Sequence, residues 1–103
     1  MTKQIESMDY CTIISDKKMK GSGLVQGDIV LITSHKDVAV SGKDPYLTRR
    51  YVLALRVVDG VHQIPKDGND YMSYLIDPRN IERVSEDKRE ELENALELQY
   101  SRN

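Results

Sequence analysis

The segment YVLALRVVDGVHQI, residues 51–64, carries the strongest structural signal in the chain. Alternate residues from Tyr51 to Val57 are apolar and fall on one face, as expected for a β-strand. Asp59 and Gly60 follow, and both tolerate the positive φ angles of a type I′ turn. The segment therefore predicts a β-hairpin whose second strand covers residues 61–64.

Other segments predict further short strands around this hairpin. Ile29–Thr33 is apolar on both faces, which is typical of a strand buried on two sides or placed where a barrel closes. The preceding residues 24–28 form a tight turn because they contain Gly27 followed by Asp28. Additional strands are expected at 10–14, 71–76 and 81–84, with a turn or a single 3₁₀ turn at 77–80.

Residues 34–50 form the longest segment without a clear secondary-structure signal. Residues 34–37 and 41–45 have turn-forming composition, and they flank Val38-Ala39-Val40, which fits a short strand. A long connection inside a small domain is usually functional or mobile.

The hydrophobic period changes from that of a strand to that of a helix after Val84. Ser85 is a good N-cap, and Leu92, Ala95, Leu96 and Gln99 recur at helical spacing. We therefore expect one C-terminal helix from about residue 86 to about residue 100. Its apolar stripe is narrow, which suits packing across one end of a small barrel or against a second copy of the chain.

Length and composition favour one soluble domain. The 103 residues suffice for a single core, and they divide into a lead-in with a flexible loop (1–23), a β-barrel (24–84) and a helix (85–103). There are 15 basic and 17 acidic residues, so the chain lacks the strong basic excess typical of nucleic-acid-binding domains. No apolar run approaches the roughly 20 residues needed to cross a bilayer. We expect a cytoplasmic protein without a membrane partner.

The order of these elements resembles an SH3-like or Sm-like small barrel, with five to six short, mostly antiparallel strands and one C-terminal helix. The resemblance rests on Val25–Val30, the hairpin around Asp59-Gly60, and the turn at 77–80 that leads to Val84. As a compact single domain rich in charged residues, the chain also resembles small accessory proteins of tailed phages. Small barrels of this kind bind peptides, RNA or further copies of themselves, so the resemblance does not select a function.

The residues that usually carry catalysis do not form a recognisable motif. Residues 21–27 have the spacing G-x-G-x-x-x-G and precede a strand, whereas a phosphate site needs a helix N-terminus. His35 and His62 have no evident carboxylate partner, although either could serve a small enzyme. Cys11 lies in an apolar run and is expected to be a buried small hydrophobe. We expect no catalytic residue, no metal and no cofactor, and His62 is expected to be half exposed on a strand.

Two groups of residues could form contacts with other molecules. Arg49, Arg50 and Tyr46 could hold a phosphate, a carboxylate or a base, with help from the loop lysines Lys17, Lys18 and Lys20. The alternative to a ligand site is a structural role, in which the two arginines form ion pairs with acids such as Asp44. On the helix, an interface could be formed by Leu92, Leu96 and Tyr100.

Three hypotheses of function follow from these patterns. The leading one is a noncatalytic small β-barrel that acts through protein–protein contacts, most simply by self-association, with the helix and strand edges as interface. The first alternative is a nucleic-acid-binding barrel that uses the lysine loop and the arginine group. The second alternative is a small enzyme that uses His35 or His62.

Overall fold

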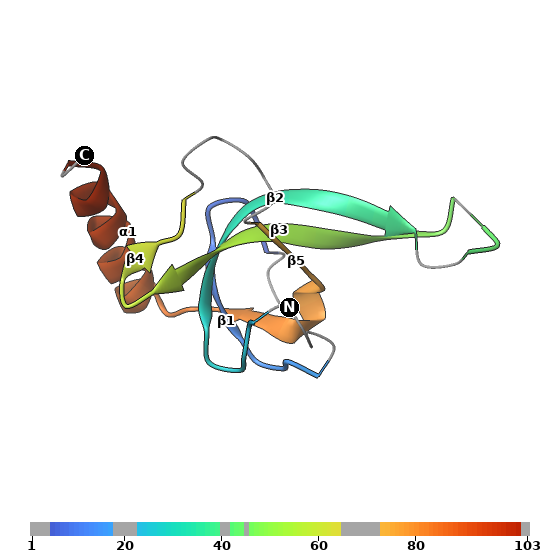
Figure 1. Ribbon diagram of the computed structural model, residues 1–103, viewed down its shortest axis with the longest axis horizontal. Helices are drawn as coiled ribbons and strands as arrows, with labels where there is room; N and C mark the ends of the chain where they lie inside the picture. Colours follow the sequence, from blue (N-terminus) through green and yellow to red (C-terminus); the bar gives the residue numbers. More distant parts are fainter. Residues whose placement is uncertain (1–4, 18–22, 40–41, 45, 65–72, 102–103) are drawn as a thin grey trace.

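The computed structural model describes residues 5–17, 23–39, 42–44, 46–64 and 73–101. Within them the chain forms a sheet of antiparallel strands followed by one C-terminal helix (Figure 1). The elements in chain order are β1 (Tyr10–Ile13), β2 (Ile29–Ala39), β3 (Thr48–Val58), β4 (Val61–His62), β5 (Tyr74–Ile76), the 3₁₀ helix η2 (Pro78–Asn80), β6 (Ile81–Arg83) and α1 (Glu86–Ser101). The predicted class, mainly β with a C-terminal helix, is confirmed.

The strands are ordered β4-β3-β2-β1-β6, and β5 pairs with the same edge of β3 as β4. All pairs are antiparallel. Among the described residues no strand pairing joins β6 to β4 or β5, so hydrogen bonds do not close the sheet into a barrel. The barrel geometry expected from the sequence is therefore not established by strand pairing.

The predicted Asp59-Gly60 hairpin is confirmed. Both residues have positive φ angles, 51° for Asp59 and 80° for Gly60, and Val58 pairs directly with Val61. The second strand is shorter than expected, because β4 contains only Val61 and His62. This short strand leaves most of the outer edge of β3 available to β5.

The segment 34–50 differs most from its prediction. Residues 34–37, expected to form a turn, continue β2 as a regular ladder with β3 that reaches Ala39 opposite Thr48. The register shifts between Ile32 and Ser34, which marks a β-bulge at Thr33. Residues 33–37 are polar and mostly exposed, so no apolar pattern marks the continuation of the strand in the sequence.

Two clusters of buried side chains lie on opposite faces of the sheet. The larger cluster draws residues from β1, β2, β3, β5 and β6, namely Cys11, Ile13, Val30, Ile32, Val52, Ala54, Ile76 and Ile81, together with Leu24. The smaller cluster joins the other face to α1 through Tyr10, Leu31, Val57 and Leu92. β2 is thus buried on both faces, as predicted. On β3, Val52 and Ala54 form the main core, while Tyr51, Leu53 and Leu55 stay half buried.

Helix α1 begins and ends within a residue of its predicted bounds. Ser85 caps it, since its Oγ accepts a hydrogen bond from the Lys88 amide at 3.3 Å. Leu92 is its one fully buried residue among those described. Near the C-terminal end, Gln99 holds both backbone groups of His62, accepting from the amide at 2.8 Å and donating to the carbonyl at 2.9 Å. The helix is therefore attached to the sheet at two points.

The remaining short elements follow the sequence signals. β1, η2 and β6 lie where a strand, a 3₁₀ turn and a closing strand were predicted. Gly27, with φ of 98°, supplies the tight turn before β2, and the Asp28 amide donates to the Val25 carbonyl at 3.1 Å. Residues 21–22 of the glycine-rich loop, the loop 65–70 and the first residues of the strand expected at 71–76 lie outside the described residues.

Candidate functional site

The outer halves of β2 and β3 form a two-stranded ribbon that extends away from the rest of the sheet. We call its described residues, 34–39, 42–44 and 46–51, the distal arm. In Figure 1 the distal arm points to the right, away from α1. Most of its residues are exposed, because β1 and β5 pair only with the inner parts of β2 and β3. Its inner part still contacts other segments, through the His35–Ile5 hydrogen bond and the Arg49–Asp77 ion pair, whereas its outer part pairs with no other described strand.

The tip of the distal arm presents two large apolar side chains to solvent. Tyr46 is 92% exposed and Leu47 is 53% exposed. Asp44 fixes the local turn, since its Oδ1 accepts from the Tyr46 amide at 2.9 Å and its carbonyl from the Leu47 amide at 3.2 Å. The turn thus presents an aromatic and an aliphatic side chain from a hydrogen-bonded backbone.

Arg49 and Arg50 lie at the base of the distal arm, and both are paired with carboxylates. Arg49 Nη1 lies 3.7 Å from Asp77 Oδ2, and Arg50 Nε lies 3.6 Å from Asp37 Oδ1. Asp77 also forms a 2.8 Å ion pair with Arg79, whose hydrogen bonds lower the pKa of the Asp77 carboxyl below its usual value. The expected pairing of the arginines with acids is present, although with these partners instead of Asp44.

The lysine group proposed from the sequence is only partly described. Lys17 is exposed in the loop after β1, whereas Lys18 and Lys20 lie outside the described residues. Lys17 belongs to the connection between β1 and β2, while Arg49 and Arg50 lie on β3. The described residues therefore do not establish a single basic surface.

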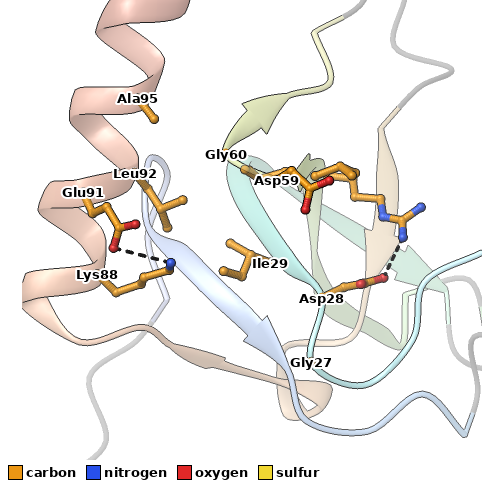
Figure 2. Close-up of a pocket in the computed structure, with 12 residues that line it drawn as sticks. Gly27, Asp28, Ile29, Asp59, Gly60, Lys88, Glu91, Leu92 and Ala95 are labelled. Atoms are coloured by element: carbon orange, nitrogen blue, oxygen red, sulfur yellow. Dashed lines mark hydrogen bonds and ion pairs between the residues drawn. The ribbon is translucent and has the colours of Figure 1, made fainter.

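A groove of about 460 Å³ lies between α1 and the Asp59-Gly60 hairpin (Figure 2). Its apolar lining comes from the sheet and from the helix: Ile29, Val57, Val58, Leu92 and Ala95. The rim is charged. Arg56 pairs with Asp28 at 3.2 Å and Lys88 with Glu91 at 3.5 Å.

A second hollow of about 360 Å³ lies beside the N-terminal segment. Ile5, Val52 and Pro78 line it together with Glu6, His35 and Arg50. His35 Nε2 lies 2.9 Å from the carbonyl oxygen of Ile5, so a ring nitrogen is already used in a structural hydrogen bond.

His62 is buried, and the expectation of a half-exposed strand residue was wrong. Only 2% of its surface is accessible, because α1 packs over β4. Its Nε2 lies 2.7 Å from the Tyr10 hydroxyl, and the two rings meet edge to face at 80°. Burial lowers the pKa of His62 below 6.5. These contacts describe a neutral histidine that joins β1 to β4.

Cys11 is a buried small hydrophobe, as predicted. Its side chain belongs to the larger core, and burial raises the pKa of the thiol to about 12. The thiol therefore stays protonated at neutral pH.

Within the described part of the chain, no three histidine, cysteine or acidic residues gather as ligands for a metal ion. The described helices also include none with the length and apolar character to cross a bilayer.

The three helix residues proposed as an interface have different environments. Leu92 packs inside the smaller core, Leu96 is half buried, and Tyr100 is exposed. Sequence reasoning missed Leu98, which is 59% exposed, and the groove next to it. The i,i+3 spacing of Ala95 and Leu98 makes them neighbours on the helix surface and could have indicated an apolar patch there.

Comparison with known proteins finds no matching family model, no similar curated protein and no similar solved structure.

Proposed function

We propose that this protein is a noncatalytic, SH3-like small barrel that acts through protein–protein contacts and associates with itself. The observation that carries the proposal is the distal arm, a projecting and mostly exposed ribbon that presents Tyr46 and Leu47 to solvent at its tip. Exposed aromatic and aliphatic side chains on a projecting element are characteristic of interaction surfaces. Such a surface would supply contact area without requiring a reactive cleft.

The barrel part of the proposal is supported by strand order and by the core. Apart from the short β4, the order is β5-β3-β2-β1-β6, and η2 connects β5 to β6. All five strands contribute buried side chains to one cluster. The shared core and the pairing of β1 with β6 support the barrel part of the proposal.

Contact with protein explains the distal arm better than contact with nucleic acid does. The exposed side chains at its tip are Tyr46 and Leu47, and a phosphate backbone would not use the leucine. Arg49 and Arg50 already have carboxylate partners, Asp77 and Asp37, which offset their positive charge. A basic surface that binds nucleic acid depends on a local excess of positive charge.

Sedimentation velocity on the full chain, from low to high micromolar concentration, tests this proposal. We expect the wild-type protein to show concentration-dependent association, and the double variant Tyr46→Ser/Leu47→Ser to remain monomeric. Val25→Ser is the matched control, because Val25 is 52% exposed at a place remote from the tip along the chain. Thermal unfolding should give the same midpoint for all three proteins, since the changed side chains are exposed.

Two results would overturn the proposal. One is a wild-type protein that stays monomeric at every concentration. The other is a double variant that associates as strongly as the wild type. Salt-sensitive retention of single-stranded RNA or DNA by the wild-type monomer would favour the nucleic-acid hypothesis instead.

A further inference from the structure

We infer that the groove between α1 and the Asp59-Gly60 hairpin receives the distal arm of a second copy of the chain. This inference rests on the proposed self-association and names the two surfaces that meet. Three observations support it: the apolar match between the surfaces, their opposite charge, and their positions in the molecule.

The groove offers apolar surface of the kind that the tip of the distal arm needs to cover. In Figure 2, Ile29 lies near Leu92, which is already buried, and Ala95 lies one turn further along α1, so on these elements the open apolar surface comes from the half-buried Ile29 and Ala95. Val58 lines the groove and is itself exposed, and Leu98 lies on the same helical face as Ala95. Tyr46 and Leu47 could bury their exposed side chains against this surface.

The two surfaces also carry opposite charge. Residues 34–51 contain four basic and two acidic residues, net +2, whereas residues 85–101 contain two basic and six acidic residues, net -4. The groove lining itself contains three acidic and two basic residues, net -1: Asp28, Asp59 and Glu91 with Arg56 and Lys88. Asp59 forms no ion pair with any described residue, and the Glu91 carboxylate is well exposed.

Charge also argues against the two symmetric ways of self-association, in which distal arm contacts distal arm or α1 contacts α1. Contact between two distal arms would join two segments that each carry a net charge of +2 over residues 34–51. Contact between two α1 helices would join two segments that each carry a net charge of -4 over residues 85–101. Like charges oppose both arrangements, whereas contact between the distal arm and the groove joins opposite charges.

The positions of the two surfaces require a second molecule. In Figure 1 the distal arm and α1 lie at opposite ends of the folded molecule, whose longest dimension is 49 Å. The distal arm of one copy therefore does not reach the groove of the same copy. The resulting contact is heterologous, because two different surfaces meet.

Complementation between two variants tests this contact directly. The arm variant is Tyr46→Ser/Leu47→Ser, and the groove variant is Glu91→Lys/Ala95→Lys, which changes two residues that line the groove, reversing the charge at Glu91 and placing a charged side chain on its apolar wall. Glu97→Lys is the matched control for the groove variant, because Glu97 is an exposed acid on the same helix that does not line the groove. Circular dichroism and thermal unfolding establish that each variant is folded.

We expect each double variant alone to associate at least about tenfold more weakly than the wild type. An equimolar mixture of the two should form a 1:1 complex, because the groove variant keeps an intact distal arm and the arm variant keeps an intact groove. Glu97→Lys should associate like the wild type. Added salt should weaken association of the wild-type chain, since the participating charges are exposed.

The inference is overturned if the groove variant associates like the wild type, or if the mixture forms no 1:1 complex. Suppose that the wild type associates, that the arm variant does not, and that one of these two results is obtained. The proposed function then stands, and only the groove is rejected as the receiving surface. A monomeric wild type rejects both.

Discussion

The Tyr10 hydroxyl lies 2.7 Å from Nε2 of His62, and both side chains are buried. The two residues are 52 positions apart in the sequence, and their hydrogen bond joins β1 to β4 across the face of the sheet that α1 covers. Gln99 of α1 binds the backbone of the same histidine. His62 therefore connects the sheet, the hairpin and the helix that together border the groove.

Replacing Tyr10 by Phe should destabilise the protein by about 1 to 3 kcal/mol, because His62 Nε2 would stay buried without its hydrogen-bond partner. Urea unfolding followed by circular dichroism measures the change in the free energy of unfolding. Tyr100→Phe is the matched control, since Tyr100 is exposed, and it should change stability by less than about 0.5 kcal/mol. Equal effects of the two substitutions would contradict a structural role for the hydrogen bond.

Stability should decrease as the pH falls below about 6.5. Burial lowers the pKa of His62 in the folded state below 6.5, so the unfolded chain binds a proton more readily than the folded chain. The stabilisation is fully present above the unfolded-state pKa and is lost as the pH falls toward the folded-state pKa. Measuring the free energy of unfolding from about pH 8 to about pH 5 tests this.

The variant His62→Gln provides the comparison for this pH dependence. Glutamine does not titrate, so the free energy of unfolding of the variant should vary less with pH in the same window. The carboxyl of Asp77 contributes in a separate window, because its lowered pKa removes stability only as the pH falls below 3.8. If wild type and variant have the same slope between pH 8 and 5, His62 is not the titrating group.

Replacing Leu92 by Ala should cost about 2 to 5 kcal/mol, because it opens a cavity where α1 packs on Leu31 and Val57. Leu98→Ala changes the same residue type on the same helix at an exposed position. It should therefore alter stability by less than about 0.5 kcal/mol. Thermal or urea unfolding of both variants measures the difference. A small loss for Leu92→Ala would mean that α1 contributes little to the core.

Replacing Gly60 by Ala should destabilise the hairpin by about 1 to 2 kcal/mol, because φ of 80° is unfavourable for a residue with a Cβ atom. No heavy atom lies within 4 Å of the added methyl position, so the cost is conformational and not a clash. Gly42→Ala is the control: Gly42 has the same open surroundings and no positive φ. Equal unfolding midpoints for the two variants would exclude the conformational explanation.

Several elements could be predicted because their signals are local. The Asp59-Gly60 turn depends on two residues that accept positive φ angles, the start of α1 depends on the Ser85 cap, and η2 follows from Asp77-Pro78. Each signal lies within a few residues of the structure it specifies. The burial of Ile29–Ile32 on both faces could also be predicted, since every residue of that run is apolar.

The candidate site could be predicted only in part. Residue type alone points to Arg49, Arg50 and Tyr46, and the structure places the two arginines on β3 and Tyr46 at the tip of the distal arm. Their partners Asp77 and Asp37 and the neighbouring groove were not predicted, because they depend on strand register and on where α1 packs.

The sequence by itself determined the turns at Asp59-Gly60 and Asp77-Pro78, the helix bounds and the mainly β class, because these depend on the conformational preferences of neighbouring residues. Tertiary structure alone decided the length of β2, the burial of His62 and the groove beside α1. A bulge at Thr33 changes which face later side chains occupy, and a polar residue such as His62 is buried only when distant residues supply its hydrogen bonds. Such effects arise between segments far apart in the chain, where no local pattern records them.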